Sequence, residues 1–447
     1  MLQKNLDLLH GPVLPALTRL ALPIMGTSFV QMAYNMTDML WIGRLGSDAV
    51  AAVGASGMYM WLAGGVAVMP RMGGQVKTGH AMGAGQTGEA AVYARTALQM
   101  GILAGLLYGI IALLFSGPLI GFFSLHSSRI VADAQSYLQI TCGLVVFSFI
   151  NQVLTGITTA MGNSRISFLA TSTGLVANII LDPVLIFGIG PFPELRVAGA
   201  AIATVTAQAI VTVVFLAYVL REPSLFRHIR ILERPDLAHI REIVQIGLPS
   251  ALQNMAFTGI SMILTRLVAT FGDAAVAVQR VGSQIENISW VTAEGFGAAV
   301  NAFLAQNLGA GKKDRIRKGY RAALAAIFVW GLFCTFLLMV LPAPIFRLFI
   351  QEEELLPMGV NYLWILGISQ LFMCVELTTA GAFSGLGKTV PPSVVSIVFT
   401  AARIPLAFLL SSTVLGLNGV WWSVSLSSVV KGVVLCSWFL FYLKKRL

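Results

Sequence analysis

The second half of this chain repeats its first half at a constant distance of 226 residues. Single matches are expected by chance in a chain rich in glycine and alanine, but one register running through prolines, a tripeptide and an arginine is not. The register slips to 225 at Gly162 and Gly387, as a small loop deletion would cause. We therefore predict an internal duplication, and hence two domains of like design. The matched positions are Pro23 and Pro249, Gly46 and Gly272, 83–85 and 309–311, Arg95 and Arg321, 97–98 and 323–324, and Pro118 and Pro344.

Each half contains six apolar stretches of about 20 residues or more, the length that a helix needs to cross a bilayer. Hydrophobic residues make up 57% of the chain and charged residues only 11%, which excludes an ordinary soluble domain. The sequence therefore predicts an all-α membrane protein with twelve transmembrane helices. The stretches are 14–42, 48–70, 90–115, 131–160, 167–188 and 198–220 in the first half, and 243–270, 275–305, 320–342, 358–384, 392–414 and 418–441 in the second.

The even number of helices in each half fixes how the two halves are related. Six crossings return the chain to its starting side, so both halves insert with the same orientation. A pseudo-two-fold axis should then run along the membrane normal. We expect an N-terminal six-helix lobe at 1–220, a cytoplasmic linker at 221–241 and a C-terminal six-helix lobe at 242–447.

The net charge of +10 does not indicate nucleic-acid binding, because the basic residues follow the predicted topology. Most Lys and Arg residues lie at both termini and in the even-numbered connections, and positive charge near helix ends stays cytoplasmic. We expect a multi-pass protein of the inner (plasma) membrane with both termini in the cytoplasm. Its partners should be the lipid bilayer and small molecules, without nucleic acid, and we expect a monomer.

Catalytic signatures are absent from the sequence. There is no HExxH, GxSxG or CxxC motif, and the segment 385–389 fails as a phosphate-binding loop because Ala382 replaces the required glycine. We therefore expect no enzyme activity, no cofactor and no bound metal. Without a nucleotide site, uphill transport would have to draw on an ion gradient.

Several polar residues of the first half are predicted to lie at similar depth below the outer ends of their helices. Each helix rises about 1.5 Å per residue. Counting from the outer ends brings Asp38, Ser56, Tyr137, Asp182 and Thr204, from five helices, into one layer. Because a carboxylate in hydrocarbon is costly, each aspartate is a candidate functional residue.

The spacing of neighbouring polar residues supports this cluster. Gln31, Tyr34 and Asp38 share one helix face, as do Asn178 and Asp182. Pro183 should kink its helix and free a carbonyl beside the site. Two adjacent carboxylates in a pocket of low dielectric cannot both ionise cheaply, so at least one should bind a proton reversibly. With Asn178 and Thr204 as further oxygen ligands the cluster could hold a small hard cation, while the alternative is that both aspartates are structural.

Six residues of the first half are candidates for substrate binding. Flexible methionines suit a cavity that accepts varied apolar molecules, although they also fill ordinary cores. The candidates are Gln31, Met32, Tyr34, Met36, Tyr137 and Asn151.

The second half contains further charges within its helices. Arg280, Glu286 and Glu294 lie in the stretch 275–305, and Glu376, Arg403 and Lys431 lie in three later helices. Unpaired charges at these depths would be expensive, so a structural ion pair or triad is the simpler interpretation. The alternative is a gate that breaks and reforms these pairs.

Three segments together resemble the multidrug and toxic compound extrusion (MATE) family, and within it the DinF-like branch: 42–54, 178–183 and 199–204. The resemblance covers nearly the whole chain. It implies a twelve-helix, two-lobe antiporter with a large central cleft that expels organic cations and other amphiphiles in exchange for protons or sodium. By motif, Asp38 resembles the family's cation-responsive aspartate of helix 1. The residues similar to the polar network of its first lobe are Gln31, Tyr34, Asn178, Asp182 and Thr204.

The second half departs from the NorM-like branch, whose second lobe has acidic residues in helices 7 and 10. Residues 253–259 contain no carboxylate, and Met373 occupies the helix 10 position. We therefore expect coupling in the first lobe, to protons, with sodium as the second candidate ion. An alternative function is a flippase for lipid-linked saccharides, which would use Arg280, Arg403 and Lys431 to bind pyrophosphate.

Overall fold

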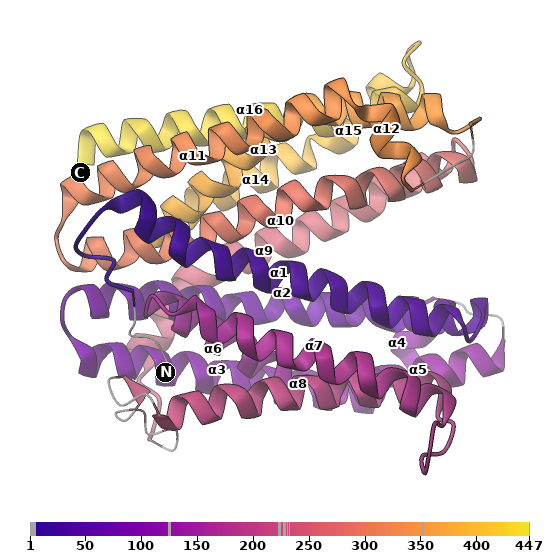
Figure 1. Cartoon of the computed structure of the whole chain (residues 1–447), viewed down its shortest axis with the longest axis horizontal. Helices are drawn as coiled ribbons and strands as arrows, with labels where there is room; N and C mark the ends of the chain where they lie inside the picture. Colours follow the sequence, from indigo (N-terminus) through magenta and orange to yellow (C-terminus); the bar gives the residue numbers. More distant parts are fainter. Residues whose placement is uncertain are drawn as a thin grey trace. The chain divides into compact units, whose positions relative to one another are not determined.

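The computed structural model describes residues 6–123, 127–221, 225–226, 229, 231, 233–349 and 353–446, and this part of the chain contains helices but no strand (Figure 1). Each predicted stretch corresponds to one helix or to a broken pair of helices. The helices of the first half are α1 (Val13–Gly43), α2 (Ser47–Gly83), α3 (Thr87–Leu114), α4 (Ser116–Gly121), α5 (Ser128–Gly143), α6 (Val146–Ala160), α7 (Ser164–Phe187) and α8 (Arg196–Arg221).

The second half follows the same order of elements. A short helix again follows the third long one, as α4 follows α3 in the first half. The helices are α9 (Leu237–Ala269), α10 (Asp273–Gly309), α11 (Lys313–Val340), α12 (Pro342–Arg347), α13 (Leu356–Gly385), α14 (Val390–Ala401), α15 (Arg403–Ser411) and α16 (Leu417–Arg446). The predicted linker 221–241 lies partly outside the described residues.

Two predicted helices are broken. The stretch 131–160 divides into α5 and α6, which meet at an angle of 42°. The stretch 392–414 divides at Ala402 into α14 and α15. Pro405 lies in the first turn of α15 and has no N–H to donate to the carbonyl of Ala401, which explains the second break. In contrast, α7 runs through Pro183 to Phe187 without ending.

In the described part of the chain, nine helices are long and apolar enough to span a membrane, with α14 and α15 counted as one, and the bent pair α5 and α6 makes a tenth. The other two long helices, α9 and α10, do not meet this criterion. Polar side chains explain the difference for α10, which contains Arg280, Glu286 and Glu294 within its length. Its exposed residues include Arg280, Gln284 and Glu294.

The chain forms two compact units whose boundaries differ from those predicted. The first unit comprises Met1–Asp7 and Gly26–Ala251, and the second comprises Leu8–Met25 and Leu252–Leu447. The predicted lobes, 1–220 and 242–447, placed all of α1 in the first lobe and all of α9 in the second. Instead, both helices pass from one unit to the other near their middle, at positions that are equivalent in the repeat.

Local contacts hold these exchanged segments in their units. In the second unit, the Arg315 guanidinium donates hydrogen bonds to the carbonyls of Leu8, His10 and Gly11, at 2.8–3.0 Å. In the first unit, a Cβ atom at Gly73 would lie 2.3 Å from the carbonyl oxygen of Ile243. Glycine thus allows α2 and α9 to approach closely, and Ile243 is completely buried.

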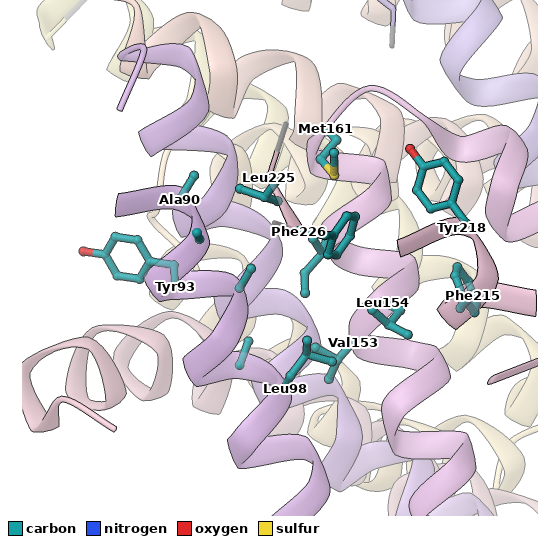
Figure 2. Close-up of a cluster of buried hydrophobic side chains, with 14 of the residues drawn as sticks. Ala90, Tyr93, Leu98, Val153, Leu154, Met161, Phe215, Tyr218, Leu225 and Phe226 are labelled. Carbon is teal, nitrogen blue, oxygen red and sulfur yellow. The ribbon is translucent and has the colours of Figure 1, made fainter. Parts of the chain in front are cut away.

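A large apolar core of the first unit joins α3, α6 and α8 (Figure 2). Leu98, Val153 and Phe215 contribute from these three helices, and each is buried. Leu225 and Phe226, which follow α8, are also buried in this cluster. The core thus anchors part of the predicted linker to the first unit.

The second unit is built around α13, which packs against α10, α11 and α16 (Figure 1). More than half of the apolar segment of α13 is buried inside the protein, a larger share than in any other candidate span. Phe383 of α13 makes an edge-to-face contact with Phe439 of α16, with ring centroids 4.6 Å apart. This central position also buries the ionisable residue Glu376.

Candidate ion-coupling site

The close packing of α7 against α8 sets the position of the candidate site. A Cβ atom at Gly199 would lie only 2.4 Å from the carbonyl oxygen of Leu185, so only glycine allows the backbones to approach this closely. The end of α7 also requires glycine, because Gly188 adopts a left-handed backbone conformation with φ 70°. Together these glycines allow the first turns of α8 to pack beside the segment of α7 that contains Asp182.

The site is centred on the two aspartates and one amide. Asn178 and Asp182 are completely buried, and Asp38 is 9% exposed. The side chain of Asn178 donates a hydrogen bond of 3.0 Å from Nδ2 to Oδ1 of Asp182, as their spacing of one helical turn allows. Neither aspartate is therefore directed outward from its unit.

Electrostatic contacts bring residues of four helices together. Asp38 and Asp182 interact with each other across α1 and α7. Tyr34 and Tyr137 each interact with both aspartates, and the Tyr34 hydroxyl also lies beside the side chain of Thr204 on α8. With Asn178, which is hydrogen-bonded to Asp182, the structure thus brings together six of the residues singled out in the sequence.

Several oxygen atoms in this cluster are buried but have no hydrogen-bond partner among the described residues. They come from α1, α7 and α8, and both aspartates contribute one. Such atoms are costly unless a ligand or a proton satisfies them. They are the Tyr34 hydroxyl, Oδ1 of Asp38, Oδ1 of Asn178, Oδ2 of Asp182 and Oγ1 of Thr204.

The remaining predicted residues differ in their surroundings. Ser56 donates to the backbone carbonyls of Ala52 and Ala134, so its hydroxyl serves packing. Asn151 is hydrogen-bonded to Gln208 and accepts from Thr212, which satisfies both ends of its amide within a separate α6–α8 network. Gln31 and Met36 are exposed and Met32 is half-buried, whereas Tyr137 is buried.

The charged residues of the second half differ in their partners. Lys431 on α16 pairs with Glu376 on α13, with 3.0 Å between Nζ and Oε1. The guanidinium of Arg403 donates to Ser427 and Ser428, at 2.5 and 3.0 Å, and no carboxylate lies within salt-bridge distance of it in the described part of the chain. Arg280 is exposed. Of the predicted ion pair or triad, the described residues contain one direct ion pair, with a neighbouring arginine that donates to hydroxyls.

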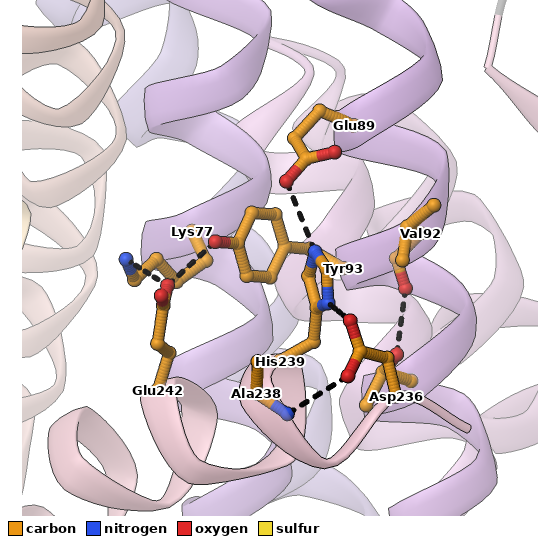
Figure 3. A network of polar contacts seen from close by, with 9 residues as sticks. Lys77, Glu89, Val92, Tyr93, Asp236, Ala238, His239 and Glu242 are labelled. Carbon is orange, nitrogen blue, oxygen red and sulfur yellow. Dashed lines mark hydrogen bonds and ion pairs between the residues drawn. The ribbon is translucent and has the colours of Figure 1, made fainter.

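Sequence reasoning missed a second polar network, where the start of α9 meets α2 and α3 (Figure 3). The His239 ring lies between two carboxylates, with Nε2 3.0 Å from Glu89 and Nδ1 2.8 Å from Asp236. Glu242 accepts from Tyr93 at 2.5 Å and forms a salt bridge with Lys77. The partners from α3 and α9 are about 150 positions apart in the sequence. The only sequence signal for their pairing is that charged residues occur near the helix ends.

The α1, α7 and α8 cluster has the chemistry of a site for a small cation. Two carboxyl groups, an amide oxygen and two hydroxyls are oxygen ligands suited to a proton or a small hard ion. A charge taken up there would relieve the repulsion between Asp38 and Asp182, while Asn178 keeps Asp182 oriented. Binding and release of one ion would thus change the charge of the site.

Comparison with known proteins identifies the family. The family model described as MatE matches residues 23–184 and again residues 249–409. The two matches begin 226 residues apart and end 225 apart, which are the offset and the slip seen in the sequence. The matched segments include every residue of the α1 and α7 part of the cluster.

Similar proteins cover almost the full chain. A probable multidrug resistance protein NorM from Thermotoga maritima is 29% identical over 91% of this chain and 87% of its own. An FAD transporter from Shewanella oneidensis is 24% identical over 98% and 96%. A solved transporter of the MOP superfamily from Pyrococcus furiosus has the same fold, with a TM-score of 0.90, 23% identity and full coverage of both chains. The protein therefore belongs to the MATE family of membrane transporters, which are not enzymes.

Proposed function

We propose that this protein is a multidrug efflux antiporter that exports organic cations and other amphiphilic compounds in exchange for protons. It would work by alternating access, as a monomer in the inner membrane with both termini in the cytoplasm. The observation that carries the proposal is the set of buried, unpartnered oxygens contributed by Tyr34, Asp38, Asn178, Asp182 and Thr204. The names of several relatives, including the NorM protein, support the multidrug assignment.

Proton binding at this cluster would change its charge and its hydrogen bonds together. A proton on Asp38 or Asp182 removes the repulsion between the two carboxylates and converts one acceptor into a donor. Unpartnered neighbours such as Oδ1 of Asn178 or Oγ1 of Thr204 could then accept a hydrogen bond. Release of the proton would restore the negative charge that attracts a cationic substrate, so proton and substrate would compete for one site.

The deciding experiment measures ethidium transport in proteoliposomes under an imposed pH gradient and, separately, under an imposed sodium gradient. We expect transport to follow the pH gradient, and we expect Asp38→Asn and Asp182→Asn each to reduce it at least tenfold. Asp133→Asn provides a matched control, because this aspartate of the same unit lies outside the cluster. Transport that follows only the sodium gradient would show that the coupling ion is sodium and not the proton.

Unchanged proton-driven transport by Asp38→Asn would refute the role given to this cluster. The alternative function as a lipid-linked saccharide flippase is not favoured, since the named relatives are multidrug and FAD transporters. Membership of the DinF-like branch stays a prediction from the sequence motifs.

A further inference from the structure

The second unit contains two buried carboxyl groups with different surroundings. Glu376 on α13 is 6% exposed and faces the Lys431 ammonium at 3.0 Å. Glu286 on α10 is half-buried as a residue, but its Oε1 atom is buried and has no hydrogen-bond partner among the described residues. An ionised carboxylate needs such partners in a low-dielectric environment, so only Glu376 is equipped to stay permanently charged.

The position of Glu286 is set by its neighbours on α10 and α13. A Cβ atom at Gly282 would lie 2.1 Å from the ring of Tyr362, so glycine makes room for this ring against α10. Gly282 precedes Glu286 by one helical turn, so the Tyr362 side chain lies beside the Glu286 carboxyl group. Trp421 packs edge-to-face on the same ring, with centroids 5.0 Å apart, and holds it in place.

A cation lies close enough to make the ionised form accessible. Arg403 interacts electrostatically with Glu376 and also with Glu286, although its hydrogen bonds go to Ser427 and Ser428. The neighbouring ion pair of Glu376 and Lys431 has no net charge. When Glu286 is ionised the four charges therefore sum to zero, and when it is protonated the cluster carries the single positive charge of Arg403.

We propose that Glu286 is a second proton-exchanging carboxyl group, located in the second unit and separate from the Asp38 and Asp182 cluster. In the protonated state the Glu286 carboxyl group holds the proton, beside the side chain of Tyr362. On release, the O–H bond of the carboxyl group breaks, the proton passes to water, and the carboxylate left behind is balanced by Arg403. The partial exposure of the residue gives the proton a route to water. This inference adds a proton site to the proposed antiporter and rests on its being proton-coupled.

The test is infrared difference spectroscopy of the purified protein between about pH 6 and about pH 9, a range in which ordinary carboxyl groups stay ionised. The Asp38→Asn/Asp182→Asn variant removes the first-unit aspartates from the signal. We expect the difference spectrum of this variant to contain the band of a carboxyl group that is protonated at the lower pH and ionised at the higher. This band should disappear when Glu286→Gln is added. The Glu376→Gln/Lys431→Met pair, added instead, is the matched control and should leave the band in place.

A further variant separates proton exchange from a structural role. Arg403→Gln removes the balancing charge, so the Glu286 band should persist to higher pH than in the parent variant. Absence of any band in the Asp38→Asn/Asp182→Asn variant, or a band that Glu286→Gln does not remove, would overturn the inference. Neither result would contradict the proposed function, which is refuted only if Asp38→Asn transports normally under a pH gradient.

Discussion

At the scale of single residues, the absence of a side chain at Gly199 allows the candidate coupling site to form. Gly199→Ala would place a Cβ atom 2.4 Å from the carbonyl oxygen of Leu185, so α8 must move away from α7. We expect a loss of about 1–3 kcal/mol in stability, typical of overpacking, together with a large loss of transport. Thermal unfolding in detergent and ethidium efflux would measure the two effects.

Gly54→Ala is the control for this prediction. Gly54 lies inside α2, and a Cβ atom there meets nothing within 4 Å. Alanine favours a helix over glycine by about 1 kcal/mol, so this substitution should be neutral or stabilising. Equal destabilisation by both substitutions would show that close packing at Gly199 is not the cause.

The Lys431 and Glu376 pair gives a second prediction at this scale. Lys431→Met leaves the Glu376 carboxylate buried without its cation, which should cost about 3–5 kcal/mol. Lys431→Met combined with Glu376→Met replaces both charges with apolar groups and should recover most of that loss. A double-mutant cycle of unfolding temperatures measures the coupling, and additive losses would contradict a direct pair.

The sequence revealed residues whose partners lie on the same helix, and missed those whose partners lie elsewhere. Asn178 and Asp182 are one turn apart, and their spacing predicted the shared helix face on which the structure has a hydrogen bond between them. The hydroxyls that hold Arg403 come from another helix, and serine is too common in this chain to mark Ser427 and Ser428 in advance. Asn151 was included in the substrate set, yet its amide is satisfied by α8.

At the scale of elements, the beginning of α9 is held against α3 by a histidine between two carboxylates. Burial would lower the pKa of His239, but its hydrogen bonds to Glu89 and Asp236 outweigh burial and raise the pKa above its ordinary value of 6.5. The backbone N–H of Ala238 and the His239 ring in turn lower the pKa of Asp236. Only the doubly protonated ring can donate to both carboxylates at once.

This arrangement predicts a pH-dependent contribution to stability. Because the pKa of His239 is raised by folding, the contribution is complete below its ordinary value and is lost as the pH rises through the raised value. His239→Gln should therefore lower the unfolding temperature by about a few degrees at most near pH 6, and by progressively less as the pH increases. Thermal scans of both proteins across this range provide the measurement, and a difference independent of pH would be evidence against the mechanism.

Helices were easier to predict than their interruptions. The predicted stretches overlap every long helix of the described residues, including α9 and α10, which are less apolar than the others. The break at Ala402 had a local signal in Pro405, whereas the bend between α5 and α6 occurs without a proline between Ser128 and Ala160. At this bend α3 packs closely on the end of α5, since a Cβ atom at Gly109 would meet the carbonyl of Gly143 at 2.6 Å.

At the scale of the whole molecule, each compact unit is assembled from both halves of the sequence. The first unit needs the start of α9, and the second needs the start of α1. A chain cut within 227–230 and expressed as two pieces should therefore copurify in mild detergent when only one piece carries a tag. Gly73→Leu, which disrupts the contact with Ile243, should weaken this copurification, and pieces that separate freely would contradict the exchange of segments.

The duplication was visible in the sequence, but this exchange was not. A repeat shows which positions are equivalent and gives no information on which copy each segment packs against. The predicted boundary at 221–241 followed the most polar connection, while the compact units divide inside two apolar helices. Only three-dimensional contacts such as those of Arg315 with Leu8 and Gly11 could reveal this.

The division of α1 and α9 has a mechanical consequence. Met25 and Ala251, the last residues before each crossing, stand 226 positions apart, and each lies two residues after a proline, Pro23 and Pro249. The chain thus crosses between the units at matched places, each shortly after a proline that leaves one backbone hydrogen bond of its helix unmade. The internal repeat thus gives α1 and α9 equivalent positions at which bending would cost the least hydrogen bonding.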